Sequence, residues 1–494
     1  MKNLYISFFV LSALFVSGCS DDFLDIDQTK NVPDQPEQVN SDQGATTMVD
    51  GIYNIFLAWD MSSFAWNAVT SIISDDADKG SDPGDTGVDK AVIDALEYNA
   101  STPSFQSIWD YNYAGINRAN QALEMLPKLD QVTPALKTRL AGEAKFLRAF
   151  MYFTLVKGYG GVPIVDHLSP VPISDADKTM QLTRRSVADV YAFIEKDLNE
   201  AAEALPLKSA YSGSDVARVS KGSAYALLAK VSLYQKKWQN VVDNCNKVTG
   251  YSLVSDYSLQ FKKEGEFGPE STFEINGIGS PTAPGFGIGN YTASQAPRGA
   301  GGWGWGFNTP SQGLADVYEP GDVRRAATII FRGTTLYDGR EVAATVSNPM
   351  YNYKAYSSAF YNLEFTDTNL RYLRYAEVLL MKAEALNELG QTGDAITLVD
   401  QVRLRANLGG TPAVSQSDVR TAIWKERRVE LAFEHDRWFD LVRTGQAEAA
   451  MKADVSPAFP NGKTFIVGKH ELFHIPSSFI QQSVGYSQQN PGGY

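Results

Sequence analysis

Apolar residues recur every three or four positions through most of the chain from residue 104 to residue 250. This spacing is typical of amphipathic helices, each of which buries one face. In SFQSIWDYNYAGINRANQALEML, the residues Ile108, Ile116 and Leu123 lie on one such face. A second stretch with the same pattern, LKTRLAGEAKFLRAFMYFTLVKGYG, ends at closely spaced glycines, which terminate helices. The chain is therefore predicted to be mainly α-helical.

The helical stretches come in pairs joined by short turns. VADVYAFIEKDLNEAAEAL precedes KGSAYALLAKVSLYQKKWQNVVDNCNKVTG, and LRYLRYAEVLLMKAEALNELGQTGDAITLVDQVRLRANL has Gly390 at its turn. This layout resembles the tetratricopeptide helix-turn-helix unit, with looser spacing than its consensus. Because such units bury their faces on one another, we predict a scaffold of stacked helical pairs over residues 45–260 and 366–450.

The helical pattern is interrupted between residues 261 and 365, where a large irregular region is expected. Glycine and aromatic residues are both frequent there, as in RGAGGWGWGFNTP. Long loops inside a compact protein are usually functional or disordered, and disordered segments are poor in aromatic residues. We therefore predict a loop-rich ligand-binding region on a rigid helical frame. Residues 451–494 are expected to form a C-terminal extended segment.

The first residues are typical of an export signal. An apolar run from Leu4 to Val16 follows a single positive charge, and it is too short for a spanning helix. The small residues before Cys19 resemble the lipobox of bacterial lipoproteins, so residues 1–18 are predicted to be the signal peptide and Cys19 the lipidated residue. The alternative is an ordinary signal peptide with an incidental cysteine. Residues 19–44 lack periodicity and are predicted to be a tether.

Charge and cysteine content limit the partners and the means of stabilisation. The formal net charge of −13 argues against nucleic acid and against anionic lipid as partners. It fits a neutral ligand. Cys245 is the other cysteine in the chain, so a mature protein beginning at Cys19 has no internal disulfide available and depends on burying its own core.

Four motifs, in order along the chain, resemble the SusD/RagB family of outer-membrane nutrient-binding lipoproteins. They are GEAKFLRAFMYFTLVKGYGGVPIV, RYAEVLLMKAEAL, RVELAFEHDRWFDLVRTG and LFHIPSSFIQQSVGYSQQNPGGY. The resemblance implies a lipid-anchored protein on the cell surface, without a catalytic role. It also implies that the protein binds oligosaccharide or polysaccharide and delivers it to a SusC-like TonB-dependent transporter. Some members bind peptides, which is the alternative; a glycoside hydrolase is a further one.

The candidate ligand site combines aromatic and polar side chains. Residues two apart in an extended loop face the same way at about 6.6 Å, so the two indoles of the glycine-rich loop could lie under neighbouring sugar rings. Further aromatic residues would complete this platform, and amide and carboxylate groups would bind sugar hydroxyls. The predicted ligand-binding residues are Trp303, Trp305, Trp66, Tyr291, Asn67, Asp75 and Asp76. The alternative is that these rings fix the loop to the frame.

Other charged patterns are interpreted as structural. The acidic stretch SDDADKGSDPGD could offer oxygens to calcium, although its spacing differs from an EF-hand loop and a solvated turn is the simpler reading. Glu426, Glu430 and Glu434 recur at four-residue spacing near arginines, which indicates ion pairs between helices. HELFH matches a zinc-protease motif, but Pro476 favours an extended chain there, where both histidines cannot share a helical face. No cofactor is predicted.

Overall fold

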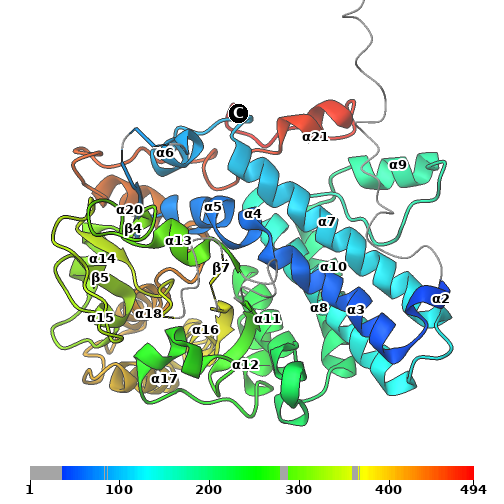
Figure 1. Cartoon of the computed structure of the whole chain (residues 1–494), viewed down its shortest axis with the longest axis horizontal. Coiled ribbons are helices and arrows are strands. Elements are labelled where there is room, and N and C mark those ends of the chain that lie inside the picture. Colours follow the sequence, from blue (N-terminus) through cyan, green and yellow to red (C-terminus); the bar gives the residue numbers. More distant parts are fainter. Residues whose placement is uncertain (1–35, 83, 86, 279–287, 359–364, 367) are drawn as a thin grey trace, which may run out of the picture.

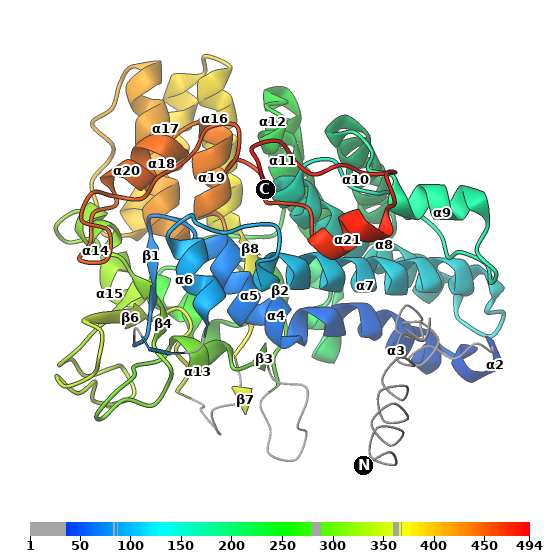
Figure 2. The same cartoon turned by 90° about the horizontal axis from the view of Figure 1, so that it is seen from above.

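A row of packed helices forms the frame of the protein (Figures 1 and 2). The computed structural model describes residues 36–494 apart from 83, 86, 279–287, 359–364 and 367. The first part of the row consists of α7 (Pro103–Met125), α8 (Pro134–Tyr159), α10 (Val187–Ala204), α11 (Lys221–Tyr234) and α12 (Trp238–Asn246), with α9 (Asp175–Leu182) at its side. Helix α8 packs between α7 and α10, and α10, α11 and α12 follow in order.

The C-terminal helices continue this row. They are α16 (Tyr375–Glu388), α17 (Thr392–Arg405), α18 (Gln416–Leu431), α19 (Arg437–Thr444) and α20 (Ala447–Ala453). Helix α16 packs against α12 on one side and against α17 and α18 on the other. One core of buried apolar residues runs through both parts of the row. The prediction of a mainly α-helical scaffold of stacked pairs is therefore confirmed.

The sequence explains where the helices begin and how closely they approach. Pro103 and Pro134 stand in the first turns of α7 and α8, where proline costs no hydrogen bond. Helix α8 ends at Tyr159 and is followed by Gly160, whose φ of +74° favours glycine. At Gly142, in the middle of α8, an added Cβ would lie 2.9 Å from the Cβ of Ala204. This glycine therefore allows α8 and α10 to pack closely.

Short helices at the start of the described chain lie against the frame. They are α2 (Pro36–Val39), α3 (Asp42–Tyr53), η2 (Asn54–Leu57), α4 (Trp59–Ser62), α5 (Phe64–Asn67), η3 (Ala68–Ile72) and α6 (Val88–Asp94). The Ser41 hydroxyl caps α3 by accepting a hydrogen bond from the Gly44 N–H, and Val39 is buried. The packed part of the chain thus starts before the predicted end of the tether at residue 44.

Short helices and strands form the described part of the region between the two parts of the row. Its helices are α13 (Tyr291–Gln295), α14 (Gln312–Val317) and α15 (Arg324–Thr328). Its strands are β2 (Ser271–Ile275), β3 (Ile288–Gly289), β4 (Phe307–Pro310), β5 (Ile329–Phe331), β6 (Met350–Asn352), β7 (Phe365–Thr366) and β8 (Leu370–Arg374), and they are joined by β1 (Ala77–Gly80) from the N-terminal segment. Among the described residues they form four two-stranded antiparallel sheets, β1–β4, β2–β8, β3–β7 and β5–β6.

The last residues return to the first helices of the row. This segment is largely extended, with the short helix α21 (Ser477–Gln482), and it lies near α7 and α8 in Figure 2. The N–H of Phe473 donates to the carbonyl of Gly158 at 2.7 Å, and the Phe479 ring lies 4.9 Å from that of Trp109. The C-terminus therefore covers the end of α8 and one side of α7.

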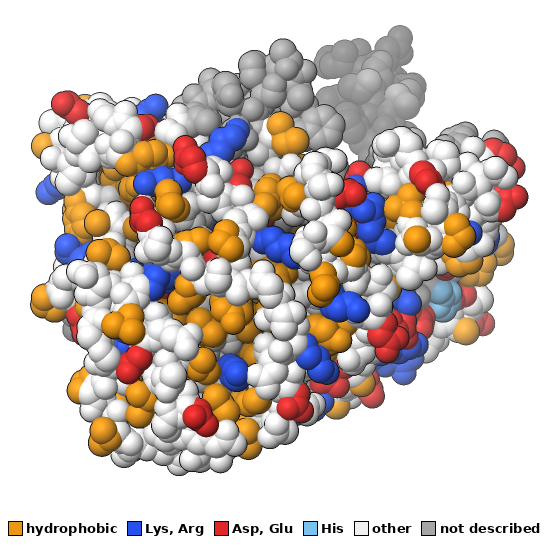
Figure 3. Space-filling model, turned by 90° about the horizontal axis from the view of Figure 1, so that it is seen from below, with side chains coloured by type: hydrophobic (Ala, Val, Ile, Leu, Met, Phe, Trp, Pro, Cys, Tyr) orange, Lys and Arg blue, Asp and Glu red, His pale blue; other side chains and the backbone are white. Residues whose placement is uncertain are grey.

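Charges of both signs are mixed on the surface of the protein. On the face seen in Figure 3, acidic and basic side chains are interspersed, with apolar side chains between them. Within the part of the chain that the structure describes, no helix combines the length and apolar character needed to cross a membrane.

Candidate functional site

The glycine-rich loop is held firmly against the segment that includes α13. The N–H groups of Trp303 and Gly304 both donate to the carbonyl of Pro297 at 2.8 Å, and the Trp305 N–H donates to the carbonyl of Ala293 at 2.9 Å. A Cβ at Gly304 would lie only 2.5 Å from the Cβ of Ala296. Glycine is thus needed here because the backbones touch, and the loop presents its indoles from a fixed position.

Trp305 lies beside a second tryptophan from a distant part of the chain. Its ring centroid is 5.5 Å from that of Trp59, with 34° between the ring planes. Phe64 contacts both indoles, and Phe307 packs edge-on against Phe64 at 4.8 Å. We call Trp59, Phe64, Trp305 and Phe307 the aromatic platform. Trp59 is 39 % exposed, Phe64 and Trp305 are half-buried, and Phe307 is buried beneath them.

Trp303 has different neighbours, so the two indoles of the loop do not form the expected pair. Its ring lies 6.2 Å from that of Tyr356, and the guanidinium of Arg340 lies 4.9 Å from its centroid. It also packs against the core cluster that contains Tyr351 and Val346. These contacts fix the loop to the protein, which is the alternative that the sequence left open for Trp303.

Three of the other predicted ligand residues lie in the interior. Trp66 is 3 % exposed, and its ring contacts those of Tyr372 and His435 at 5.9 and 5.3 Å. Asn67 and Tyr291 are buried as well. The structure therefore does not bring these residues to the aromatic platform as a surface that a ligand can reach. They were predicted to complete the platform and to bind sugar hydroxyls, but the three side chains are buried.

The two predicted carboxylates form a buried ion-pair cluster instead of a polar rim. Asp75 accepts two hydrogen bonds from Arg437, both of 2.7 Å, and Asp76 accepts one of 2.6 Å from Arg428. Burial raises the pKa of Asp75, but the guanidinium groups of Arg437 and Arg428 outweigh burial and hold that pKa below its usual value. Their role is to join the N-terminal segment to α18 and α19. We correct the prediction accordingly.

The remaining charged patterns are also structural. Glu430 of α18 pairs with Arg405 of α17 at 2.5 Å, and Glu426 of α18 pairs with Arg403 of α17 at 3.4 Å. Glu430 and Glu434 also pair with Arg374, the last residue of β8, at 3.0 and 2.6 Å. The prediction of ion pairs between helices is confirmed. In the described ranges, no group of three or more histidine, cysteine, aspartate or glutamate side chains could hold a metal ion. This finding covers the described residues of the acidic stretch and of HELFH.

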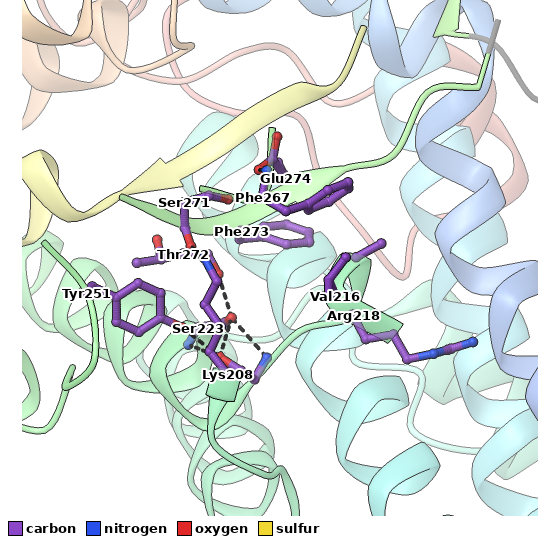
Figure 4. A pocket seen from close by; sticks show the side chains of 12 residues that line it. Lys208, Val216, Arg218, Ser223, Tyr251, Phe267, Ser271, Thr272, Phe273 and Glu274 are labelled. Atoms are coloured by element: carbon purple, nitrogen blue, oxygen red, sulfur yellow. Dashed lines mark hydrogen bonds between the residues drawn. The ribbon is translucent and has the colours of Figure 1, made fainter. Parts of the chain in front are cut away.

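Two hollows border β2. The first lies between Lys208, Tyr251 and Thr272 (Figure 4), and its volume of about 20 Å³ leaves room for little more than one water molecule. Lys208 closes it by donating to the carbonyls of Gly268 and Ser271. The second, which we call the α3 hollow, has a volume of about 470 Å³ and is bordered by Asp50, Asn54, Leu57, Arg218, Ile275 and Asn276, among others.

The sequence and the fold match proteins of one family. The model described as "SusD family" matches residues 280–492, and the model described as "Starch-binding associating with outer membrane" matches residues 22–233. The chain belongs to the SusD/RagB family. This membership agrees with the resemblance stated from the four sequence motifs.

Individual SusD relatives are similar over most of their length. SusD-like protein P38 of Formosa agariphila is 27 % identical over 491 residues, which are 91 % of this chain and 93 % of the relative. A solved structure described as a laminarin binding SusD-like protein has a TM-score of 0.76 and 28 % identity, over 92 % of this chain and 99 % of the other. Surface glycan-binding protein A from Bacteroides fluxus has a TM-score of 0.75 and 25 % identity, over 91 % and 99 %.

Proposed function

We propose that this SusD-family protein binds an uncharged glycan on its aromatic platform. The observation that carries the proposal is the contact between Trp59 and Trp305, which joins two indoles from distant segments at the surface. One face of a pyranose ring is a row of C–H groups, and stacking it on an indole buries apolar area that stabilises by about 25 cal/mol per Å². Two adjacent indoles extend this surface beyond a single sugar ring.

The relatives support the same class of ligand. One solved structure with 28 % identity is described as laminarin binding, and another with 25 % identity as a surface glycan-binding protein. The family model that matches the N-terminal half is described as starch-binding. Laminarin and starch are both uncharged polymers, which agrees with the negative charge of this chain.

The proposed setting is the outer membrane. The lipobox-like sequence before Cys19 supports a lipid anchor there, and the description "associating with outer membrane" of a matching family model points to the same location. We further propose that the protein faces the cell surface and delivers its glycan to a SusC-like TonB-dependent transporter. In this proposal, other proteins catalyse the breakdown of the glycan.

A gel-retardation assay with laminarin and starch tests the binding function. We expect at least one of these polymers to slow migration of the protein. Trp59→Ala combined with Trp305→Ala should abolish that retardation, because the stacking surface is removed, while the melting temperature stays nearly unchanged. Trp238→Ala, which removes a half-buried indole at the start of α12, is the matched control and should migrate like the wild type.

Two results would contradict the proposal. Migration that neither polymer alters would remove the support for glycan binding, and heat released on adding casein peptides to the same protein would then favour the peptide alternative. Equal retardation of the wild type and the double variant would show that glycan binds elsewhere than on the aromatic platform.

A further inference from the structure

The α3 hollow lies directly beside the aromatic platform along the chain. Leu57 borders the hollow, and Trp59 of the platform follows two residues later. Since two residues span at most about 7 Å of extended backbone, the backbone at the edge of the hollow lies close to that of Trp59. Figure 2 shows α3, which lines the hollow, and α4, which carries Trp59, following one another along the same side of the molecule.

The wall of the α3 hollow mixes apolar and hydrogen-bonding groups. Leu57 and Ile275 offer apolar surface, and Asn54 and Asn276 offer side-chain amides. Neither amide makes a side-chain hydrogen bond with another described residue, so both are free to bind a ligand. Its volume of about 470 Å³ falls within the usual range of small-molecule sites. This combination suits a sugar, which has C–H faces and hydroxyl edges.

The charges below the α3 hollow disfavour an anionic ligand. Arg218 is the basic residue among the described residues that line it, and it is engaged with Asp50 at 2.9 Å, Glu143 at 3.0 Å and Asp215 at 2.7 Å. Arg139 is shared between Glu143 and Asp215. Three carboxylates thus surround two guanidinium groups, and no positive charge is left over for a uronate or a sulfate.

We infer that the α3 hollow is a second subsite, which holds uncharged sugar residues of the same glycan chain whose neighbours stack on Trp59 and Trp305. This inference rests on the proposed function. The affinity of the protein for an oligosaccharide then depends on the length of that oligosaccharide. A short one occupies the aromatic platform alone, and a longer one continues past Leu57 into the hollow.

Gly51 offers a way to fill the hollow without disturbing the fold. It lies in α3 and lines the hollow, and a Cβ added there would meet no atom within 4 Å. Gly51→Phe should therefore block the hollow, and Gly51→Ala is the matched control. A second variant, Asn54→Ala with Asn276→Ala, removes the two free amides and leaves the space open.

Calorimetry with laminaribiose and laminarihexaose measures the effect. We expect the wild type to bind the hexaose more tightly than the biose. Gly51→Phe and the double asparagine variant should each weaken hexaose binding about tenfold, which corresponds to about 1.4 kcal/mol, and leave biose binding unchanged. Gly51→Ala should bind both sugars like the wild type, and melting curves confirm that each variant is folded.

The outcomes separate this inference from the function on which it rests. If the wild type binds the hexaose and both hollow variants bind it equally well, the α3 hollow is not a subsite although the protein binds glycan. The same conclusion follows if the variants weaken biose and hexaose binding equally. If the wild type binds neither sugar and is not retarded by either polymer, the proposed function fails and this inference fails with it.

Discussion

A half-buried carboxylate on the strand pair that includes Phe307 illustrates how single residues set the response to pH. Asp78 lies on β1, opposite Thr309 of β4, the strand that begins with Phe307 of the platform. Burial raises the pKa of Asp78 to about 7, and the negative charge of Asp94 adds to the effect. Lys463 opposes the rise, but it is already paired with Asp94 at 2.6 Å and Asp454 at 2.9 Å.

We expect the free energy of unfolding to increase by about 1 kcal/mol when the pH falls from about 8 to about 6. The raised pKa means that the folded state takes up a proton near pH 7, whereas Asp78 in the unfolded chain takes one up only near pH 4. Stability is therefore lost as the pH rises through 7. Urea unfolding at both pH values measures this change, and Asp78→Asn, which cannot ionise, should reduce it. An equal pH dependence in the two proteins would contradict the assignment.

Residue-level prediction of the site from sequence was only partly possible. The glycine-rich loop and Trp305 could be singled out, because aromatic residues on a glycine-rich backbone are unusual. Trp59 was missed, and Trp66 was chosen in its place. Both tryptophans lie in similar apolar sequence, and what separates them is a contact: Trp59 meets Trp305, while Trp66 meets Tyr372 in the core. A contact across more than 200 positions leaves no local pattern in the sequence.

At the scale of elements, the long helices were predicted from the sequence but the strands were not. The helices α7, α10 and α17 follow the apolar periodicity because each buries one face, whereas α8 and α16 are buried on nearly all sides. The strands β1 to β8 are short and were not anticipated. Strand β2 pairs with β8, which places Ser271 opposite Arg374. Such strands are defined by a distant partner rather than by their own alternation of side chains.

The close crossing of α8 and α10 yields a prediction for these two elements. Gly142→Leu should lower the free energy of unfolding by about 1–3 kcal/mol, because the new side chain would overlap Ala204 and Leu205. Gly51→Ala in α3, where a Cβ meets no neighbour, should instead raise it by about 0.5–1 kcal/mol through helix propensity. Urea unfolding measures both. Equal stability of Gly142→Leu and the wild type would show that the helices can separate at little cost.

For the whole molecule, contacts between distant parts of the chain hold the site in place. Asp75 and Asp76 tie the segment after α5 to Arg428 and Arg437 in the C-terminal half. The platform itself depends on both halves of the chain. Trp59 precedes the first part of the helical row in the sequence, and Trp305 follows it. The mainly helical fold class could be predicted from the sequence. The ion pairs of Asp75 and Asp76 could not be predicted from the sequence, because a carboxylate that is buried and paired can have the same local sequence as one in a solvated turn.

The C-terminal segment is expected to contribute to the stability of the whole fold although it is largely irregular. Phe473 is buried, and its ring packs against those of Phe105 at 4.6 Å and Tyr159 at 5.6 Å. Since removing a buried phenylalanine side chain typically costs about 3–5 kcal/mol, both Phe473→Ala and truncation after Glu471 should lower the melting temperature by several degrees. Val484→Ala, at an exposed position of the same segment, is the control and should melt like the wild type. An unchanged melting temperature of the truncated protein would show that α7 and α8 are stable without contacts to the C-terminal segment.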